Sequence, residues 1–161
     1  MKVEIFKLDD FGRGICFIND KVTFVPNTVP GDIANIKVIK EHQKYNEAIL
    51  VDLVNPSSDR IDALCPYFGI CGGCTLQTLS YEMGINYKKE KVINYFKKMG
   101  LVINPNVIEN DMPYNYRNKI TLKVVNGVIG YYELNSHRVV EINSCMLAED
   151  GINDVISVVC G

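Results

Sequence analysis

Four of the six cysteines in this chain follow a pattern that suits a metal site. Cys65, Cys71 and Cys74 lie within ten residues of one another, and Cys145 follows 71 residues after the third. Two glycines separate Cys71 from Cys74, so bare backbone can approach a bound group closely. Thiolates select soft metal centres. Unrelated core cysteines are the alternative, but a preference for burial explains no such spacing. The pattern therefore predicts a metal site.

Zinc and an iron–sulfur cluster compete for these four ligands. Structural zinc sites usually draw on two close ligand pairs. Three local cysteines with one remote partner are instead common for a four-iron–four-sulfur cluster, in which each thiolate binds one iron. His42 and His137 have no ligand-like spacing, and we expect both on the surface. The spacing favours the cluster over zinc and leaves zinc as the alternative.

Composition indicates a cytoplasmic protein without a membrane segment. The chain has 161 residues, of which 47% are hydrophobic, enough for one medium domain or two small ones. Its start carries no apolar signal-peptide core, and no apolar run reaches the length of a membrane span. In a reducing compartment, clustered cysteines more often bind metal than form disulfides.

The charge balance gives no general nucleic-acid signature. The formal net charge is −2, and only residues 57–100 lean positive, with six basic and four acidic side chains. A strongly basic chain would favour nucleic acid directly. A local basic patch remains compatible with this total, because binding depends on the field at one surface.

The first third of the chain predicts a small β-domain. Glycine, proline and Asn-Asp turns separate five expected strands, and that density of short strands is typical of a small closed barrel of the oligonucleotide-binding type. The expected strands cover residues 3–8, 14–18, 21–25, 33–39 and 45–54. Cys16 falls within one of them and is expected in the core. A polar, turn-rich stretch places the domain boundary after residue 56.

Residues 57–161 predict a mixed domain, so the fold class is α+β. Ser80 is expected to cap a long helix that stops at Gly100. An antiparallel hairpin follows over residues 120–133, turning at Asn126-Gly127. A strand over 138–142 then delivers Cys145, and a second helix is expected over 148–159. The lysines of the long helix form either a solvated face or an RNA-binding one.

Several motifs together resemble the bacterial RNA uracil-C5 methyltransferases, most closely the 23S ribosomal RNA enzymes with a four-iron–four-sulfur cluster. They occur in the family's order: the cysteine group with Thr75-Leu-Gln77, then Tyr81, Tyr116-Arg-Asn-Lys119, Ser136-His137 and Cys145. The N-terminal part resembles a TRAM domain, an RNA-binding barrel. Its turns match at Phe11-Gly-Arg-Gly14, Phe24-Val-Pro26 and Val29-Pro-Gly-Asp32. The resemblance spans the whole chain.

The resemblance implies a ligand set, a reaction and a partner. Cys65, Cys71, Cys74 and Cys145 become the ligands of a 4Fe-4S cluster. In the family's reaction a cysteine thiolate adds to C6 of uracil, C5 takes the methyl group of S-adenosylmethionine, and a base removes the C5 proton. The partner implied is RNA, in particular 23S rRNA. No obligate protein partner is indicated.

The chain also departs from the family's pattern. No glycine-rich turn follows a strand and opens a helix, as the site for S-adenosylmethionine requires. The family's Asp-Pro-Pro segment, nucleophile and base have no counterpart, and Cys160 lies in the wrong context. We therefore expect the N-terminal portion of such an enzyme, inactive alone and without catalytic residues of its own. The alternatives are a free-standing RNA-binding module with a structural four-cysteine metal site, or an electron-transfer protein.

Five residues are candidates for RNA contact. Lys7, Phe11 and Arg13 belong to the expected barrel, where aromatic stacking and phosphate pairing are the usual modes of binding. Phe11 is alternatively a core residue beside a turn. Arg117 and Lys119 begin the strand region and either touch RNA phosphate or pair with local carboxylates such as Asp111 and Glu133.

Overall fold

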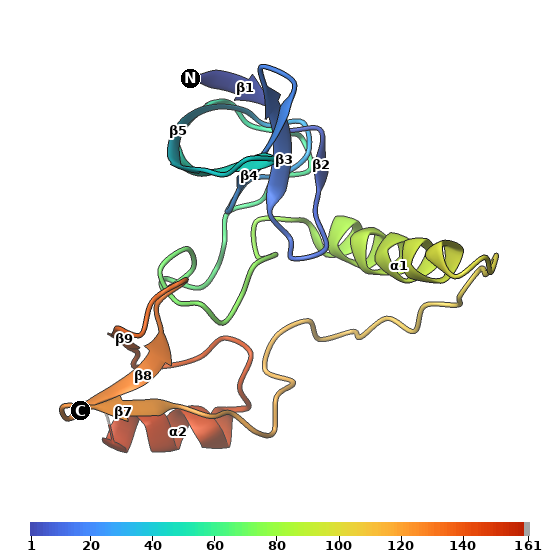
Figure 1. Ribbon diagram of the computed structural model, residues 1–161. Coiled ribbons are helices and arrows are strands. Elements are labelled where there is room, and N and C mark those ends of the chain that lie inside the picture. Colours follow the sequence, from blue (N-terminus) through green and yellow to red (C-terminus); the bar gives the residue numbers. More distant parts are fainter. Residues whose placement is uncertain (160–161) are drawn as a thin grey trace. The chain divides into compact units, whose positions relative to one another are not determined.

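The computed structural model describes residues 1–159 and divides them into two compact units (Figure 1). Of these residues, the first unit comprises 1–62 and 78–108, and the second comprises 63–77 and 109–159. The predicted division after residue 56 stays a prediction; it would assign residues 57–62 and 78–108, which group with the first unit here, to the second domain. Cys160, whose sequence context does not match the family's nucleophile, lies outside the described residues. No helix in residues 1–159 combines the length and the apolar character needed to cross a membrane.

The first unit is built on a curved, mixed six-stranded sheet in the order β1-β5-β6-β4-β3-β2. Its neighbours pair antiparallel except β4 and β6, which run parallel. The strands are β1 (Lys2–Glu4), β2 (Lys7–Leu8), β3 (Gly14–Ile18), β4 (Lys21–Val25), β5 (Ile33–Glu41) and β6 (Tyr45–Asn55). All the predicted strands are therefore present, although the first is divided in two.

Among the described residues, no ladder between the two edge strands closes the sheet into the expected barrel. The two edge strands of the sheet, β1 and β2, are consecutive segments of chain rather than neighbours in a ladder. Between them, the Ile5 N–H bonds to the Asp32 carbonyl at 2.9 Å and the Phe6 N–H to the Ile15 carbonyl at 3.1 Å. One extended segment thus serves both edges, and among the described residues no ladder joins β1 to β2.

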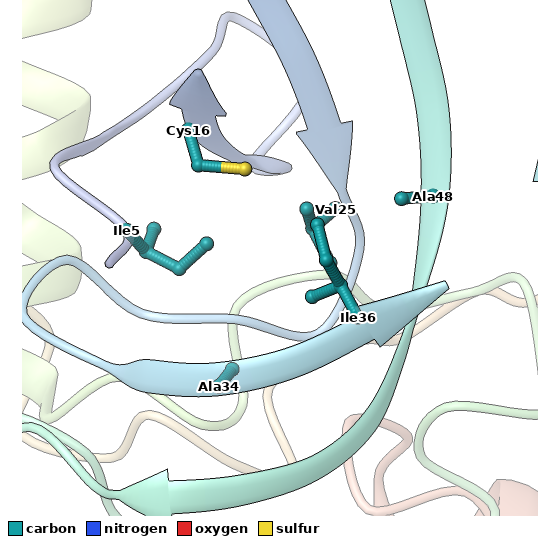
Figure 2. Close-up of a cluster of buried hydrophobic side chains, with 6 residues drawn as sticks. All are labelled: Ile5, Cys16, Val25, Ala34, Ile36 and Ala48. Carbon is teal, nitrogen blue, oxygen red and sulfur yellow. The ribbon is translucent and has the colours of Figure 1, made fainter. Parts of the chain in front are cut away.

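The concave face of this sheet holds the core of the first unit. Figure 2 shows its buried side chains directed toward one another: Ile5, Cys16, Val25, Ala34, Ile36 and Ala48. Cys16 is 1% exposed, which confirms its predicted core position, and burial raises the pKa of its thiol to about 11. A thiol with so high a pKa stays protonated and unreactive at neutral pH.

Helix α1 (Tyr81–Lys98) belongs to the first unit and starts as predicted. The Ser80 side chain accepts a hydrogen bond from the Met83 N–H at 3.2 Å, which satisfies one of the open donors of the first turn. Gly100 adopts a φ of 78° after the helix, a conformation that glycine tolerates without strain. No residue of α1 is buried.

The second unit contains a three-stranded antiparallel sheet and helix α2 (Asp150–Val159). The sheet order is β7-β8-β9, with β7 (Lys123–Val125), β8 (Val128–Tyr132) and β9 (Val139–Glu141). Asn126 and Gly127 have φ values of 52° and 81°, the positive angles of a two-residue hairpin turn. The α+β class, the hairpin and both helices are confirmed.

A buried ion pair anchors the segment after β6 to the first sheet. Asp32 is 0% exposed and receives three N–H···O bonds from the Arg60 guanidinium, at 2.6, 3.0 and 3.2 Å. The N–H groups of Val29 and Ser57 also donate to it. Burial alone would raise the pKa of the Asp32 carboxyl, but these hydrogen bonds outweigh it and hold the pKa below its ordinary value.

We predict that Asp32→Asn lowers the free energy of unfolding by about 3 kcal/mol, because it leaves the Arg60 charge partly buried without its partner. Urea unfolding followed by circular dichroism measures this. Asp52→Asn, at an exposed carboxylate hydrogen-bonded to Asn35, is the matched control and should change little. The depressed pKa adds a pH signature: the stabilisation is complete above the ordinary Asp pKa and is lost as the pH falls through the folded-state pKa. Equal effects of the two substitutions would contradict the prediction.

Candidate metal centre and nucleic-acid interface

The four predicted cysteine ligands line one small pocket of the second unit. Cys65, Cys71, Cys74 and Cys145 all border it, and its volume is about 30 Å³. Each of the four side chains is half-buried and none forms a disulfide. The structure therefore brings the remote cysteine to the other three.

The loop over residues 65–77 is wound by its own hydrogen bonds. The Cys71 N–H donates to the Tyr67 carbonyl at 2.9 Å, and the Cys65 N–H donates to Oε1 of Gln77 at 3.3 Å. The Gly73 N–H points at Sγ of Cys71, 3.4 Å away. Backbone donors aimed at sulfur are typical of sites that stabilise thiolate charge.

Backbone pairing attaches this loop to the end of β8. The Gly72 N–H bonds to the Tyr132 carbonyl at 2.9 Å, and the Leu134 N–H to the Ile70 carbonyl at 3.0 Å. A Cβ at Gly72 would lie only 3.0 Å from that Tyr132 oxygen. Glycine here thus permits the close approach of the two segments.

Asn153 of helix α2 holds Cys145 in place. Its Oδ1 accepts the Cys145 N–H at 2.8 Å, and its Nδ2 donates to the carbonyls of Cys145 and Ala148, both at 3.2 Å. On the other side, the Arg117 N–H donates to the Leu147 carbonyl at 2.7 Å. The remote cysteine therefore sits in a turn fixed from two directions.

The thiols influence one another electrostatically. Burial raises the pKa of Cys71, the Gly73 N–H opposes that rise, and the charges of the three other pocket cysteines add to it. Burial likewise raises the pKa of Cys74, whereas a hydrogen bond from Gln77 and the Arg117 charge lower it. The raised pKa values favour the protonated Cys71 and Cys74 thiols, so a metal that binds these two sulfurs would have to displace their protons.

Arg117 and Tyr131 complete the pocket wall. The Tyr131 hydroxyl is buried without a hydrogen bond of normal geometry. Its pKa is raised first by burial and then by the neighbouring Cys145 sulfur, so the two groups are close. A buried hydroxyl without an acceptor is costly, and an inorganic sulfide or a metal-bound thiolate would supply one.

Among the described residues, the four cysteines do not form a ready-made site for a single metal ion. Within residues 1–159, no three Cys, His, Asp or Glu side chains gather closely enough to hold one metal ion. Zinc at 2.3 Å from four sulfurs would need the sulfurs roughly 3.8 Å apart. A cluster places its own core between the thiolates and so suits more widely spaced sulfurs. His42 pairs with Glu47, and His137 contacts Tyr132, so neither histidine joins the pocket.

A separate surface of the first unit combines aromatic rings with cations. Phe6 and Phe17 stack with their centroids 5.2 Å apart and their planes 6° from parallel, although both are about half exposed. Lys7, a predicted contact residue, lies 5.5 Å from the Phe6 centroid. Exposed stacked rings beside a cation are the usual platform for unpaired bases.

The other two predicted contacts in this unit lie beside a third ring. The Arg13 guanidinium is 4.2 Å from the Phe24 centroid and 5.4 Å from that of Phe11, and it pairs with Asp9 at 2.6 Å. Phe11 is 73% exposed, so it is not the core residue of the alternative interpretation. We name the set Phe6, Lys7, Phe11, Arg13, Phe17 and Phe24 the aromatic surface.

Three of these rings were missed from sequence. In the sequence, Phe6, Phe17 and Phe24 look like ordinary strand hydrophobics. The alternation of side chains between the two faces of a strand nevertheless indicates which of them point away from the core. If Cys16 points into the core, its neighbour Phe17 must point to the other face, and the register pairs Phe24 with Ile15, which is on the same side of β3 as Phe17. Two successive strands therefore carry large aromatics on the convex face.

The two predicted RNA-contact residues of the second unit, Arg117 and Lys119, lie in different surroundings. Arg117 lines the cysteine pocket, so its charge acts on Cys74. Lys119 is exposed two residues further on. Glu133, one suggested carboxylate partner, instead pairs with Arg138. Whether either residue contacts RNA stays a prediction.

Comparison with known proteins finds relatives of this chain among RNA methyltransferases. The TRAM domain model matches residues 1–51. The chain is 34% identical over 162 residues to an uncharacterized RNA methyltransferase of Clostridium acetobutylicum, covering 92% of this chain and 35% of that protein. It is 32% identical to the 23S rRNA (uracil(1939)-C(5))-methyltransferase RlmD of Francisella tularensis, covering 97% and 37%.

A solved structure shares the fold. The tRNA (uracil-54, C5)-methyltransferase of Pyrococcus abyssi, in complex with S-adenosyl-L-homocysteine, superposes with a TM-score of 0.68 at 22% identity. The match covers 96% of this chain and 35% of that one. The chain thus spans about a third of the length of the relatives it matches.

We predict that Asn153→Ala lowers the free energy of unfolding of the second unit by about 2 kcal/mol, because three hydrogen bonds around Cys145 are lost. Ser157→Ala, on the same helix but hydrogen-bonded to the Asp154 carbonyl, is the control and should change stability by less than about 0.5 kcal/mol. Urea unfolding compares the two. Indistinguishable midpoints would show that Asn153 does not hold the turn.

Proposed function

We propose that the chain, which is similar to RNA methyltransferases over about a third of their length, is the RNA-recognition and cluster-bearing part of an RNA uracil-C5 methyltransferase, with 23S rRNA as its target. The observation that carries the proposal is the convergence of four cysteines, 80 positions apart at the extremes, on one pocket. The TRAM match and the aromatic surface support the RNA part.

We propose that the pocket cysteines hold a four-iron–four-sulfur cluster. Bound there, the cluster would supply a rigid link between the loop over residues 65–77 and the turn that carries Cys145. Three residues around the pocket would stabilise the thiolates that bind the cluster. Gly73 directs an N–H at the Cys71 sulfur, Tyr131 offers a buried hydroxyl, and the Arg117 charge offsets negative charge on Cys74. A structural role is the simpler hypothesis for such a link.

The aromatic surface would hold single-stranded RNA by stacking and by phosphate contacts from Lys7 and Arg13. A uracil that is to react at C5 must leave its stack, so a domain that grips unpaired bases suits that chemistry. Residues 1–159 contain no strand–helix–strand unit of the kind that binds S-adenosylmethionine. We therefore propose that these residues alone transfer no methyl group.

A free-standing RNA-binding module with a structural four-cysteine metal site is the second candidate. It is favoured by the completeness of both sites, since each is formed within one unit of this chain. Binding of S-adenosylmethionine by the whole gene product, measured by calorimetry, separates the two: the methyltransferase requires it, and the free-standing module does not.

We predict that Phe17→Ala weakens binding of a single-stranded oligouridylate about fivefold to 100-fold, because one stacking ring is removed. Val51→Ala, an exposed apolar residue on the same sheet, is the control and should leave affinity unchanged. Fluorescence anisotropy measures both, and thermal unfolding checks that both variants fold. Equal affinities would remove the aromatic surface from the proposal.

We predict that Cys145→Ser lowers the iron and sulfide retained after anaerobic reconstitution roughly tenfold or more, since losing a ligand should cost at least what losing an outer partner does. Cys16→Ala, outside the pocket, should keep the full content despite a less stable core. Iron and acid-labile sulfide assays give the answer. Full retention by Cys145→Ser would exclude Cys145 as a ligand.

A further inference from the structure

Helix α1 carries a concentration of positive charge that the proposed sites leave unused. It holds five lysines and two glutamates, in a chain whose formal net charge is −2. None of its residues is buried, so packing does not explain its composition. The lysines are Lys88, Lys89, Lys91, Lys97 and Lys98.

A cleft of about 220 Å³ lies between this helix and the loop that follows β2, entirely within the first unit. The residues that line it are Asp10, Lys91, Val92, Tyr95, Phe96 and Lys98. Lys91 and Lys98 are seven positions apart, two helical turns, and so share one face with Tyr95 between them. The cleft thus has an aromatic and apolar floor with a lysine at each end.

Hydrogen bonds fix the loop against the helix. Tyr87 donates its hydroxyl to the Asp9 carbonyl at 2.8 Å, and Nζ of Lys91 donates to the Asp10 carbonyl at 2.6 Å. Nζ of Lys98 lies 3.8 Å from the Asp10 carboxylate, with both side chains largely exposed. A pair so exposed and so long leaves the Lys98 charge available to an anion.

Tyr95 supplies a stacking surface. Its side chain is 63% exposed, and it meets Phe96 edge-on, with centroids 6.0 Å apart and planes 83° from parallel. Phe96 therefore supports the ring by its edge rather than covering it. An exposed ring flanked by cations suits a base with a phosphate on either side.

We propose that this cleft binds one nucleotide of a single-stranded RNA, with the base on Tyr95 and neighbouring phosphates on Lys91 and Lys98. The inference rests on the proposed RNA binding and extends it to a second contact region. The loop of residues 9–13 links the two regions, because Asp10 lines the cleft and Arg13 lies on the aromatic surface. Charge complementarity selects RNA as the occupant: five lysines on one exposed helix suit a polyanion.

The test compares two double variants of the whole chain in binding to a fluorescent oligouridylate of about 12 nucleotides. Lys91→Gln with Lys98→Gln should weaken binding and reduce the slope of log affinity against log salt by about 1.4, since each lost phosphate contact on a single strand contributes about 0.7. Lys89→Gln with Lys97→Gln removes the same charge from other sides of the helix, outside the cleft. It should change the slope by less than half as much.

Two substitutions of Tyr95 test whether its ring contributes to RNA binding. Tyr95→Ala should weaken binding about fivefold to 100-fold, whereas Tyr95→Phe, which keeps the ring, should bind like the parent chain. Circular dichroism checks that helix α1 persists in every variant.

The outcomes separate this inference from the function on which it rests. If both double variants act alike, or if Tyr95→Ala binds normally while Phe17→Ala does not, the cleft is overturned and RNA binding by the sheet stands. If the parent chain binds no RNA at all, the proposed function and this inference fail together.

Discussion

The second unit depends on one constraint: a thiol from residue 145 must reach a loop that ends at residue 77. Two sets of hydrogen bonds bring the two segments together. The loop pairs with the end of β8 through Gly72 and Leu134, and the turn at Cys145 is held by Asn153. Both attachments are made by groups of the protein itself, and a bound cluster would add to them.

In the first unit, small and aliphatic side chains lie on one face of the sheet and large aromatic side chains on the other. Small and aliphatic residues, among them Cys16, Ala34 and Ala48, fill the concave face of a strongly curved sheet. The large rings Phe17 and Phe24 consequently lie on the convex side, where they cannot be buried by this sheet. Cations beside those rings make the exposed surface suitable for a nucleic acid, even though the chain as a whole is slightly acidic.

Local chemistry accounts for what sequence predicted well. Ser80 caps its helix, and Asn19-Asp20 and Asn126-Gly127 adopt the positive φ values of hairpin turns, because each depends on a few adjacent residues. Tertiary arrangement accounts for the failures. The division of the first strand at Ile5 and Phe6 depends on pairing with distant Asp32 and Ile15. Asn153 and Tyr131 carry no signal of their own, since their importance arises only where the chain folds back on Cys145.

Anomalous diffraction from anaerobically purified crystals, recorded on either side of the iron absorption edge, tests the convergence of the four sulfurs most directly. The account predicts a compact group of iron peaks in the pocket, with electron density linking it to the sulfurs of Cys65, Cys71, Cys74 and Cys145. A single peak at the zinc edge, or iron density that excludes Cys145, would contradict it.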